Sequence, residues 1–157
     1  MFLILLMSAG TMLCSLVCFA AATAVVVRTV ARLLPADRND VGFWKGVGIM
    51  MVVMPITGVM HLIGICLWAM VYLLCGEMTT FETAFYFSAE NYTALGYGDF
   101  VLGERWRLLG PLEAINGLLL IGLSTAGMFV ILNRLIPHRL RREAQVRRSG
   151  PFRREKS

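Results

Sequence analysis

Residues 93–99 read Thr93-Ala94-Leu95-Gly96-Tyr97-Gly98-Asp99 and interrupt an otherwise strongly apolar chain. Because glycine has no Cβ, positions 96 and 98 can take backbone conformations that other residues rarely adopt. That freedom allows successive carbonyl oxygens to turn toward the same side of the segment. The stretch therefore predicts a functional segment that works through its backbone.

The residues just before this stretch predict a short helix. Thr79 and Glu82 have the spacing of a capping box, which would start a helix that continues to Tyr92. At 1.5 Å per residue this helix is about 20 Å long, too short to cross a bilayer. It must enter the membrane and return as a re-entrant element. Irregular backbone directly after it is tolerated at membrane depth only where it is buried in protein or lines a watery cavity.

Long apolar segments flank this region. The chain is 57% hydrophobic and only 16% charged, and charge is absent from residues 1–27, 46–76 and 114–133. A membrane-spanning helix needs about 20 apolar residues, so each segment qualifies. We expect the first to remain as a helix rather than to be cleaved as a signal peptide, since it lacks a basic leading region.

The charges are distributed unevenly between the two ends of these predicted spans. Most Lys and Arg residues lie in residues 28–45 and 134–157, whereas residues 77–113 hold most of the acids. Because loops rich in Lys and Arg stay in the cytoplasm, we expect a multi-pass protein of the inner (plasma) membrane. Its N-terminus would be outside and its C-terminus cytoplasmic. The basic tail could also attract anionic lipids of the bilayer.

A span, a re-entrant helix, a glycine-rich loop and a second span follow one another in residues 45–135, and this order resembles the pore unit of the potassium-channel superfamily. Residues 93–99 are similar to the selectivity filter of that family, usually Thr-Val-Gly-Tyr-Gly-Asp. The resemblance implies a homo-tetramer around a central pore, with potassium as the permeant ion and no cofactor. Potassium would bind the carbonyls of Ala94, Leu95, Gly96 and Tyr97, with Thr93 and Gly98 completing the filter.

The resemblance also implies roles for residues around the filter. Glu90 has the spacing of the acid that braces the aspartate of the filter, here Asp99. We expect Glu90 to be buried, and a proton or a water shared by the two carboxylates is one way to stabilise the pair. Tyr86, Phe87 and Tyr97 would either form an aromatic cuff around the filter or serve as plain packing.

The filter departs from the usual pattern at two positions, because Leu95 takes the place of valine and Ala94 that of threonine. Alanine keeps its carbonyl oxygen but lacks the hydroxyl that family members use as the innermost ligand. Ion binding at that end of the filter should be weaker, and selectivity for potassium over sodium lower.

Two further positions have alternative interpretations. Gly122 resembles the hinge of the inner helix, although close helix packing through small residues would equally explain it. His61 lies inside the second span, where a polar residue can mark an ion or proton pathway. We favour a histidine satisfied by a neighbouring helix or carbonyl, because this span offers no acidic partner.

These patterns predict an all-α membrane protein with three transmembrane helices, a re-entrant pore helix and a filter loop, assembling around a central pore. The expected units are an N-terminal helix (1–33), a pore domain (34–136) and a basic tail (137–157). The pore domain would contain an outer helix (46–76), a pore helix (79–92), the filter (93–99) and an inner helix (111–135). We expect no enzyme activity and no nucleic-acid partner. Besides a potassium channel, a weakly selective cation channel and a non-conducting assembly or regulatory protein on the same scaffold remain open.

Overall fold

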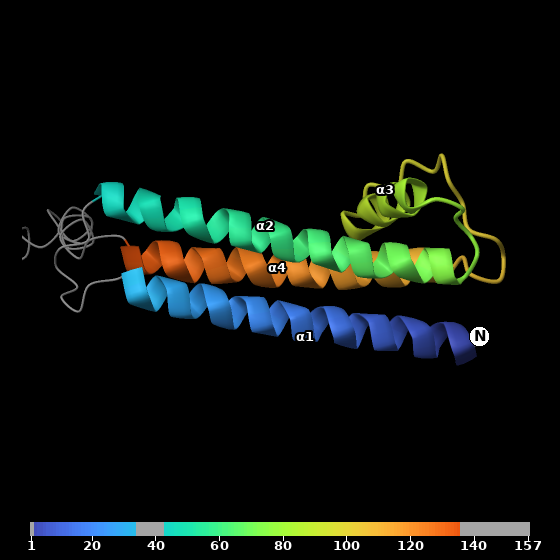
Figure 1. Cartoon of the computed structure of the whole chain (residues 1–157), viewed down its shortest axis with the longest axis horizontal. Helices are drawn as coiled ribbons and strands as arrows, with labels where there is room; N and C mark the ends of the chain where they lie inside the picture. The colour runs from blue at the N-terminus through green and yellow to red at the C-terminus, as the bar shows by residue number, and fades with distance from the viewer. Residues whose placement is uncertain (1, 34–42, 136–157) are drawn as a thin grey trace, which may run out of the picture.

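The computed structural model describes residues 2–33 and 43–135 and consists there of four helices. They are α1 (Phe2–Leu33), α2 (Phe43–Leu74), α3 (Phe81–Tyr92) and α4 (Leu109–Leu135). Helices α1, α2 and α4 run side by side along the long axis, and the short α3 lies against α2 and α4 at one end (Figure 1). The predicted linker at 34–42 and the basic tail at 137–157 lie outside the described residues.

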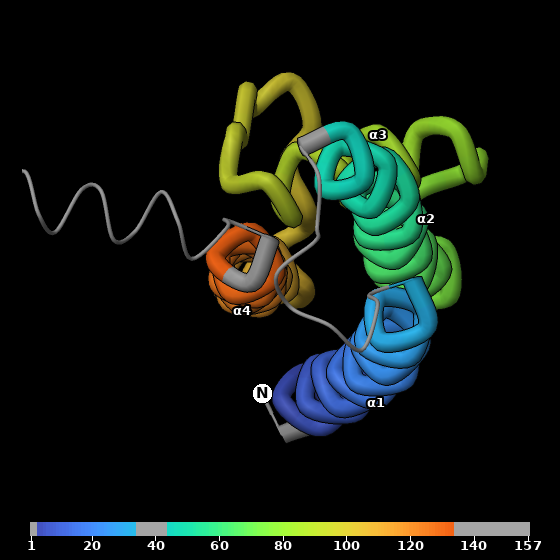
Figure 2. The backbone as a smooth tube through the Cα atoms, turned by 90° about the vertical axis from the view of Figure 1, so that its left-hand side faces the viewer, coloured from blue at the N-terminus to red at the C-terminus, as the bar shows by residue number. Residues whose placement is uncertain are grey.

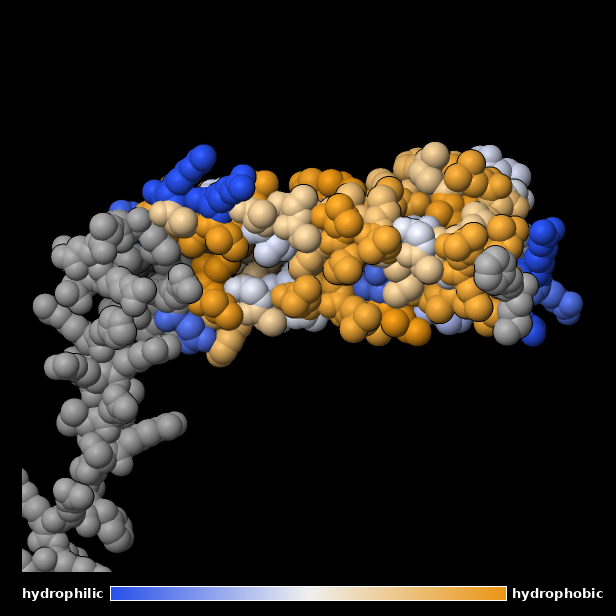
Figure 3. All heavy atoms as spheres, turned by 90° about the horizontal axis from the view of Figure 1, so that it is seen from below, coloured by the Kyte–Doolittle hydropathy of each residue, from blue (hydrophilic) through white to orange (hydrophobic). Residues whose placement is uncertain are grey.

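Three of these helices are long and apolar enough to cross a membrane, over Leu3–Leu33, Trp44–Leu74 and Leu109–Asn133. The visible surface is hydrophobic along most of its length, and hydrophilic side chains gather near the two ends (Figure 3). Side chains that face lipid need no polar partner, so such a belt is typical of a multi-pass membrane protein. The prediction of three spans and a short fourth helix is confirmed.

Helix α3 begins one residue later than the predicted cap implies. Its N-cap is Thr80, whose extended backbone places the side-chain oxygen 3.2 Å from the backbone nitrogen of Thr83, from which it accepts a hydrogen bond. The expected capping box of Thr79 and Glu82 is therefore wrong, because the adjacent threonine has the backbone geometry that reaches the third helical residue. With 12 residues, α3 is about 18 Å long and cannot span a bilayer.

The main core lies where α3 packs against α2 and α4, and Trp68, Tyr72, Tyr92 and Leu109 are among its fully buried members. A second, smaller cluster of Val30, Ile49 and Val53 lies toward the other end of the bundle.

Helix α1 packs against both α2 and α4, and it makes no contact with α3 (Figure 2). The Asn116 amide of α4 donates a 2.9 Å hydrogen bond to the Ser15 hydroxyl of α1. Since both side chains are buried between apolar helices, this contact fixes the position of α1 along α4. Helix α1 thus contacts both of the other long helices.

Candidate functional site: the loop 93–99 and its support

Along the predicted filter, residues with positive φ alternate with residues that have negative φ. Ala94, Gly96 and Gly98 have positive φ values of 57°, 54° and 80°, whereas Leu95 and Tyr97 between them do not. Such alternation directs successive N–H groups to one side of a chain. The carbonyl groups then point to the opposite side. Glycine adopts positive φ at little cost, but at Ala94 this conformation is strained.

Three N–H groups of the loop point toward helix α3. Ala94 N donates to the carbonyl of Asn91 and Leu95 N to that of Glu90, each over 2.9 Å. The N–H of Tyr97 donates to the Glu90 carboxylate at 3.3 Å. In a trans peptide a carbonyl points opposite to the next N–H group, so the carbonyls of Thr93, Ala94 and Gly96 face away from α3. Residues 93–99 are exposed in the single chain, so this side is open.

Glu90 supports the loop from behind. Its side chain is 3% exposed, which confirms the predicted burial. The hydroxyl of Tyr86 lies near both acids, since the carboxylates of Asp99 and Glu90 both act on its pKa. Burial and these two carboxylates raise the pKa of Tyr86 to about 12, which keeps its hydroxyl protonated and able to donate. A proton or water shared between the two acids stays a prediction.

The three predicted cuff aromatics lie in different surroundings. The ring of Phe87 is buried and packs edge-on against Tyr72 of α2, with centroids 4.9 Å apart. The ring of Tyr86 meets Phe100 edge-on, just beyond the loop. Tyr97 is 70% exposed in the single chain. Phe87 therefore packs within the subunit, and Tyr86 is the member that contacts the filter's supports.

A cavity of about 180 Å³ lies behind the loop, lined among others by Glu90, Asn91, Gly96, Gly98 and Arg107. It offers a carboxylate, an amide and backbone groups within a space larger than one water molecule needs. The hydroxyl of Thr93 donates a 2.7 Å hydrogen bond to the carbonyl of Ala89, which fixes its position at the start of the loop and leaves its oxygen lone pairs unused.

Residues 60–134 match the protein family described as ion channel. The chain carries an ion-channel domain. The domain is of the kind that forms the pore of potassium channels. Its family is one of ion channels and not one of enzymes. It contains the second part of α2, the whole of α3, the loop and nearly all of α4, whereas α1 lies outside it. Searches of curated proteins and of solved structures found no match.

The channel domain contains a buried acid that the sequence analysis missed. Glu113 of α4 is fully buried and accepts hydrogen bonds from the hydroxyls of Tyr72 on α2 and Ser88 on α3. The Ser88 hydroxyl also lies 2.8 Å from the carbonyl of Ile65. One carboxylate thus joins three helices of the domain. An acid just inside an apolar span was the available signal, but its partners have no regular spacing from it in the sequence.

His61 of α2 connects α3 to α4. One ring nitrogen lies 3.0 Å from the Tyr92 hydroxyl at the end of α3, and the other lies 3.0 Å from the Ser124 hydroxyl of α4. The favoured interpretation, a histidine satisfied by neighbouring helices, is confirmed. Burial and Glu113 raise the pKa of Tyr92 to about 12, so its hydroxyl stays protonated.

Two glycines of α4 differ in what surrounds them. A Cβ at Gly117 would lie 2.8 Å from the carbonyl carbon of Tyr92 and closer still to its oxygen, so only glycine allows α4 to approach the end of α3. At Gly122, the hinge candidate, a Cβ would meet nothing within 4 Å. Close packing within the subunit therefore explains Gly117 and does not explain Gly122.

Proposed function

We propose that this chain is the pore-forming subunit of a potassium-selective cation channel. The observation that carries the proposal is that the N–H groups of Ala94, Leu95 and Tyr97 all face α3. The carbonyl oxygens of Ala94, Leu95, Gly96 and Tyr97 are then free to coordinate dehydrated potassium ions in consecutive rings.

Four copies of the chain would enclose the pore. A single loop supplies one side of each oxygen ring, and residues 93–99 of one chain are exposed. The carboxyl end of α3 lies directly before the loop. Four such helix ends would direct their partial negative charge toward a cation at the centre. Gly122 of α4, with open space around it, would serve as the bend that opens the far end of the pore.

The orientation that we propose has the loop 93–99 toward the outside of the cell. Arg28 and Arg32 lie near the C-terminal end of α1, and Lys45 lies in the first turn of α2. Figure 1 shows these two helix ends at the end of the bundle opposite α3. Positive residues of this kind remain cytoplasmic. The N-terminus of α1 lies at the same end as α3 and would face outward.

Ion flux in proteoliposomes tests the proposal, with potassium and sodium compared under equal gradients. Gly96→Ala places a side chain at a φ of 54°, which disfavours the filter conformation by about 1–2 kcal/mol in each subunit. We expect it to reduce potassium flux at least about tenfold. Gly48→Ala is the matched control, because Gly48 lies within α2 and a Cβ there meets nothing within 4 Å.

The outcomes separate the three interpretations. Selective potassium flux that only Gly96→Ala abolishes supports the proposal. Equal potassium and sodium flux would leave a weakly selective cation channel, the candidate that the missing hydroxyl at Ala94 favours. If neither the natural chain nor Ala94→Thr conducts any ion, the chain is a non-conducting assembly protein on a channel scaffold.

A further inference from the structure

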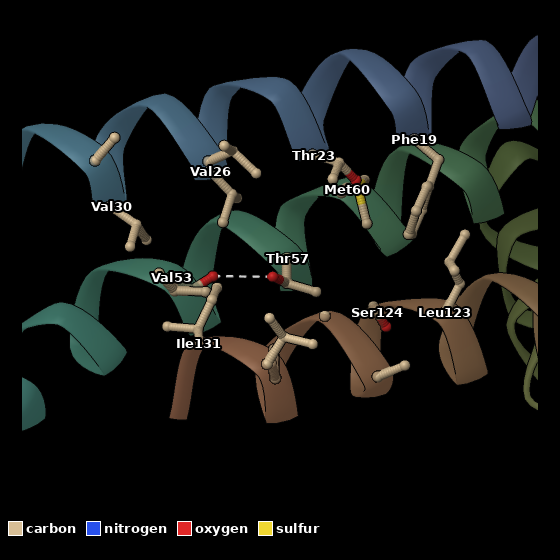
Figure 4. A pocket seen from close by; sticks show the side chains of 16 residues that line it. Phe19, Thr23, Val26, Val30, Val53, Thr57, Met60, Leu123, Ser124 and Ile131 are labelled. Atoms are coloured by element: carbon tan, nitrogen blue, oxygen red, sulfur yellow. Dashed lines mark hydrogen bonds between the residues drawn. The ribbon is translucent and has the colours of Figure 1, made fainter. Parts of the chain in front are cut away.

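Helices α1, α2 and α4 enclose a groove of about 540 Å³ in the half of the bundle away from α3 (Figure 4). Its walls run from Phe19 to Ala31 on α1, from Val53 to Met60 on α2, and from Leu123 to Ile131 on α4. Helix α1 lies outside the ion-channel domain. The groove is therefore a feature that this chain adds to the pore unit.

The chemistry of the groove suits hydrocarbon. Valine, isoleucine, leucine, methionine and phenylalanine side chains make up most of its wall. The wall carries three hydroxyls, those of Thr23, Thr57 and Ser124, and the last two already have partners within the chain. Thr57 donates to the carbonyl of Val53 at 3.0 Å, and Ser124 bonds His61 and the carbonyl of Ile121. A polar ligand would lose its hydration here with little compensation.

The length of the groove matches one leaflet of a bilayer. The wall of α1 extends over the helical segment from Phe19 to Ala31, which corresponds to about 18 Å. The hydrocarbon core of a bilayer is about 30 Å thick, so the acyl chains of one leaflet reach about 15 Å. A single acyl chain can lie along the groove with its headgroup at one end.

That end of the bundle is positively charged. Arg28 and Arg32 on the last turns of α1 and Lys45 on the first turn of α2 are all exposed. On α1, Arg28 and Arg32 directly follow Val27 and Ala31, which line the groove, and Lys45 precedes the groove wall of α2 that begins at Val53. Exposed arginine and lysine side chains at headgroup depth attract anionic lipids.

We propose that the groove holds one acyl chain of an anionic phospholipid, whose headgroup lies on Arg28, Arg32 and Lys45. The bound lipid would fill the space between α1 and the pore unit, and it could exchange with lipids of the bilayer. This site does not depend on conduction, because its residues lie away from the loop 93–99.

Native mass spectrometry of the full chain tests the site by counting retained lipids. The protein is taken from bilayers of equal parts phosphatidylglycerol and phosphatidylcholine into mild detergent. We expect one phosphatidylglycerol per subunit. In Gly127→Leu the new side chain projects into the groove, since Gly127 lines it and a Cβ there meets no atom within 4 Å. The loss of acyl-chain contacts should lower lipid retention roughly tenfold.

Gly58→Leu is the matched control, because Gly58 lies on α2, outside the groove wall, and has the same open space around a Cβ. It should retain lipid like the natural chain. The double substitution of Arg28 and Arg32 by glutamine should remove the preference for phosphatidylglycerol without altering the fold. Equal retention in Gly127→Leu and Gly58→Leu would overturn the proposal. A change of oligomer mass in Gly127→Leu with no change in lipid per subunit would also overturn it, since a second copy would then cover the groove.

Discussion

The two halves of this bundle are stabilised by different interactions. In the half that contains α3, the carboxylate of Glu113 joins α2, α3 and α4 through Tyr72 and Ser88, and Glu90 accepts a hydrogen bond from the loop. In the other half, α1, α2 and α4 meet through the apolar cluster of Val30, Ile49 and Val53 beside an open groove. Buried hydrogen bonds thus join the helices of the first half, whereas apolar packing beside a groove characterises the second.

This difference matters because the surrounding lipid is as apolar as a leucine side chain. Apolar contacts between helices therefore contribute little beyond their van der Waals packing. The groups in a buried hydrogen bond, by contrast, have no water to bond with instead, so the bond fixes the relative positions of its helices. We infer that the half that contains α3 provides the rigid mount of the proposed filter, and that the other half is the part that can move if α4 bends.

Removal of the Glu113 carboxylate should produce the largest effect. Glu113→Ala leaves the buried hydroxyl of Tyr72 without its acceptor and leaves Ser88 with only the carbonyl of Ile65, which should lower the free energy of unfolding by about 3 kcal/mol. Thermal unfolding of the purified protein in detergent measures the loss. Glu82→Ala, at an exposed position of α3, should change it by less than about 0.5 kcal/mol. Equal losses in the two variants would contradict the role of Glu113 as the residue that joins the three helices.

Closing the contact between α4 and α3 should produce an intermediate effect. Gly117→Ala forces the added methyl against the carbonyl of Tyr92, and overpacking of this kind costs about 1–3 kcal/mol. Because Tyr92 ends the pore helix, potassium flux should fall together with stability. Gly127→Ala on the same helix meets open space and should be neutral or stabilising by about 0.5 kcal/mol. A harmless Gly117→Ala would show that α3 and α4 are not held as closely as described.

The link between the halves should show the smallest effect. Ser124→Ala removes one of the two partners of His61, at a cost of about 1 kcal/mol. In a double-mutant cycle with Tyr92→Phe, the two losses should not add, since both act on one imidazole. Thr125→Ala removes a hydroxyl that bonds only its own helix, and it should add to Tyr92→Phe without coupling. Simple additivity in both cycles would mean that His61 does not transmit between α3 and α4.

Much of the fold was predictable because the position and length of each helix depend on the local sequence. Apolar runs of sufficient length predict the three spans, and a helix too short to span predicts a re-entrant element. The cap of α3 was wrong by one residue, since Thr79 and Thr80 are both suitable and only the backbone conformation selects between them. Glu90 was predicted to be buried from its place near the end of α3, and this is confirmed.

Other parts of the site depend on contacts between residues far apart in the chain. Glu113 bonds residues 41 and 25 positions away, so no regular spacing in the sequence predicts that Tyr72, Ser88 and Glu113 meet. The closeness of Tyr86 to both Glu90 and Asp99, and that of Gly117 to Tyr92, have the same origin.

The sequence alone determined the number of spans, the position of the glycine-rich loop and the charges at the ends of the bundle, because hydropathy, chain flexibility and charge belong to individual residues and their neighbours. Only the tertiary structure decided which side of the loop faces α3, which acid joins the three helices and where α1 leaves a groove. These features arise from helices brought together in space, where burial and hydrogen-bond geometry select among partners that the sequence leaves equal.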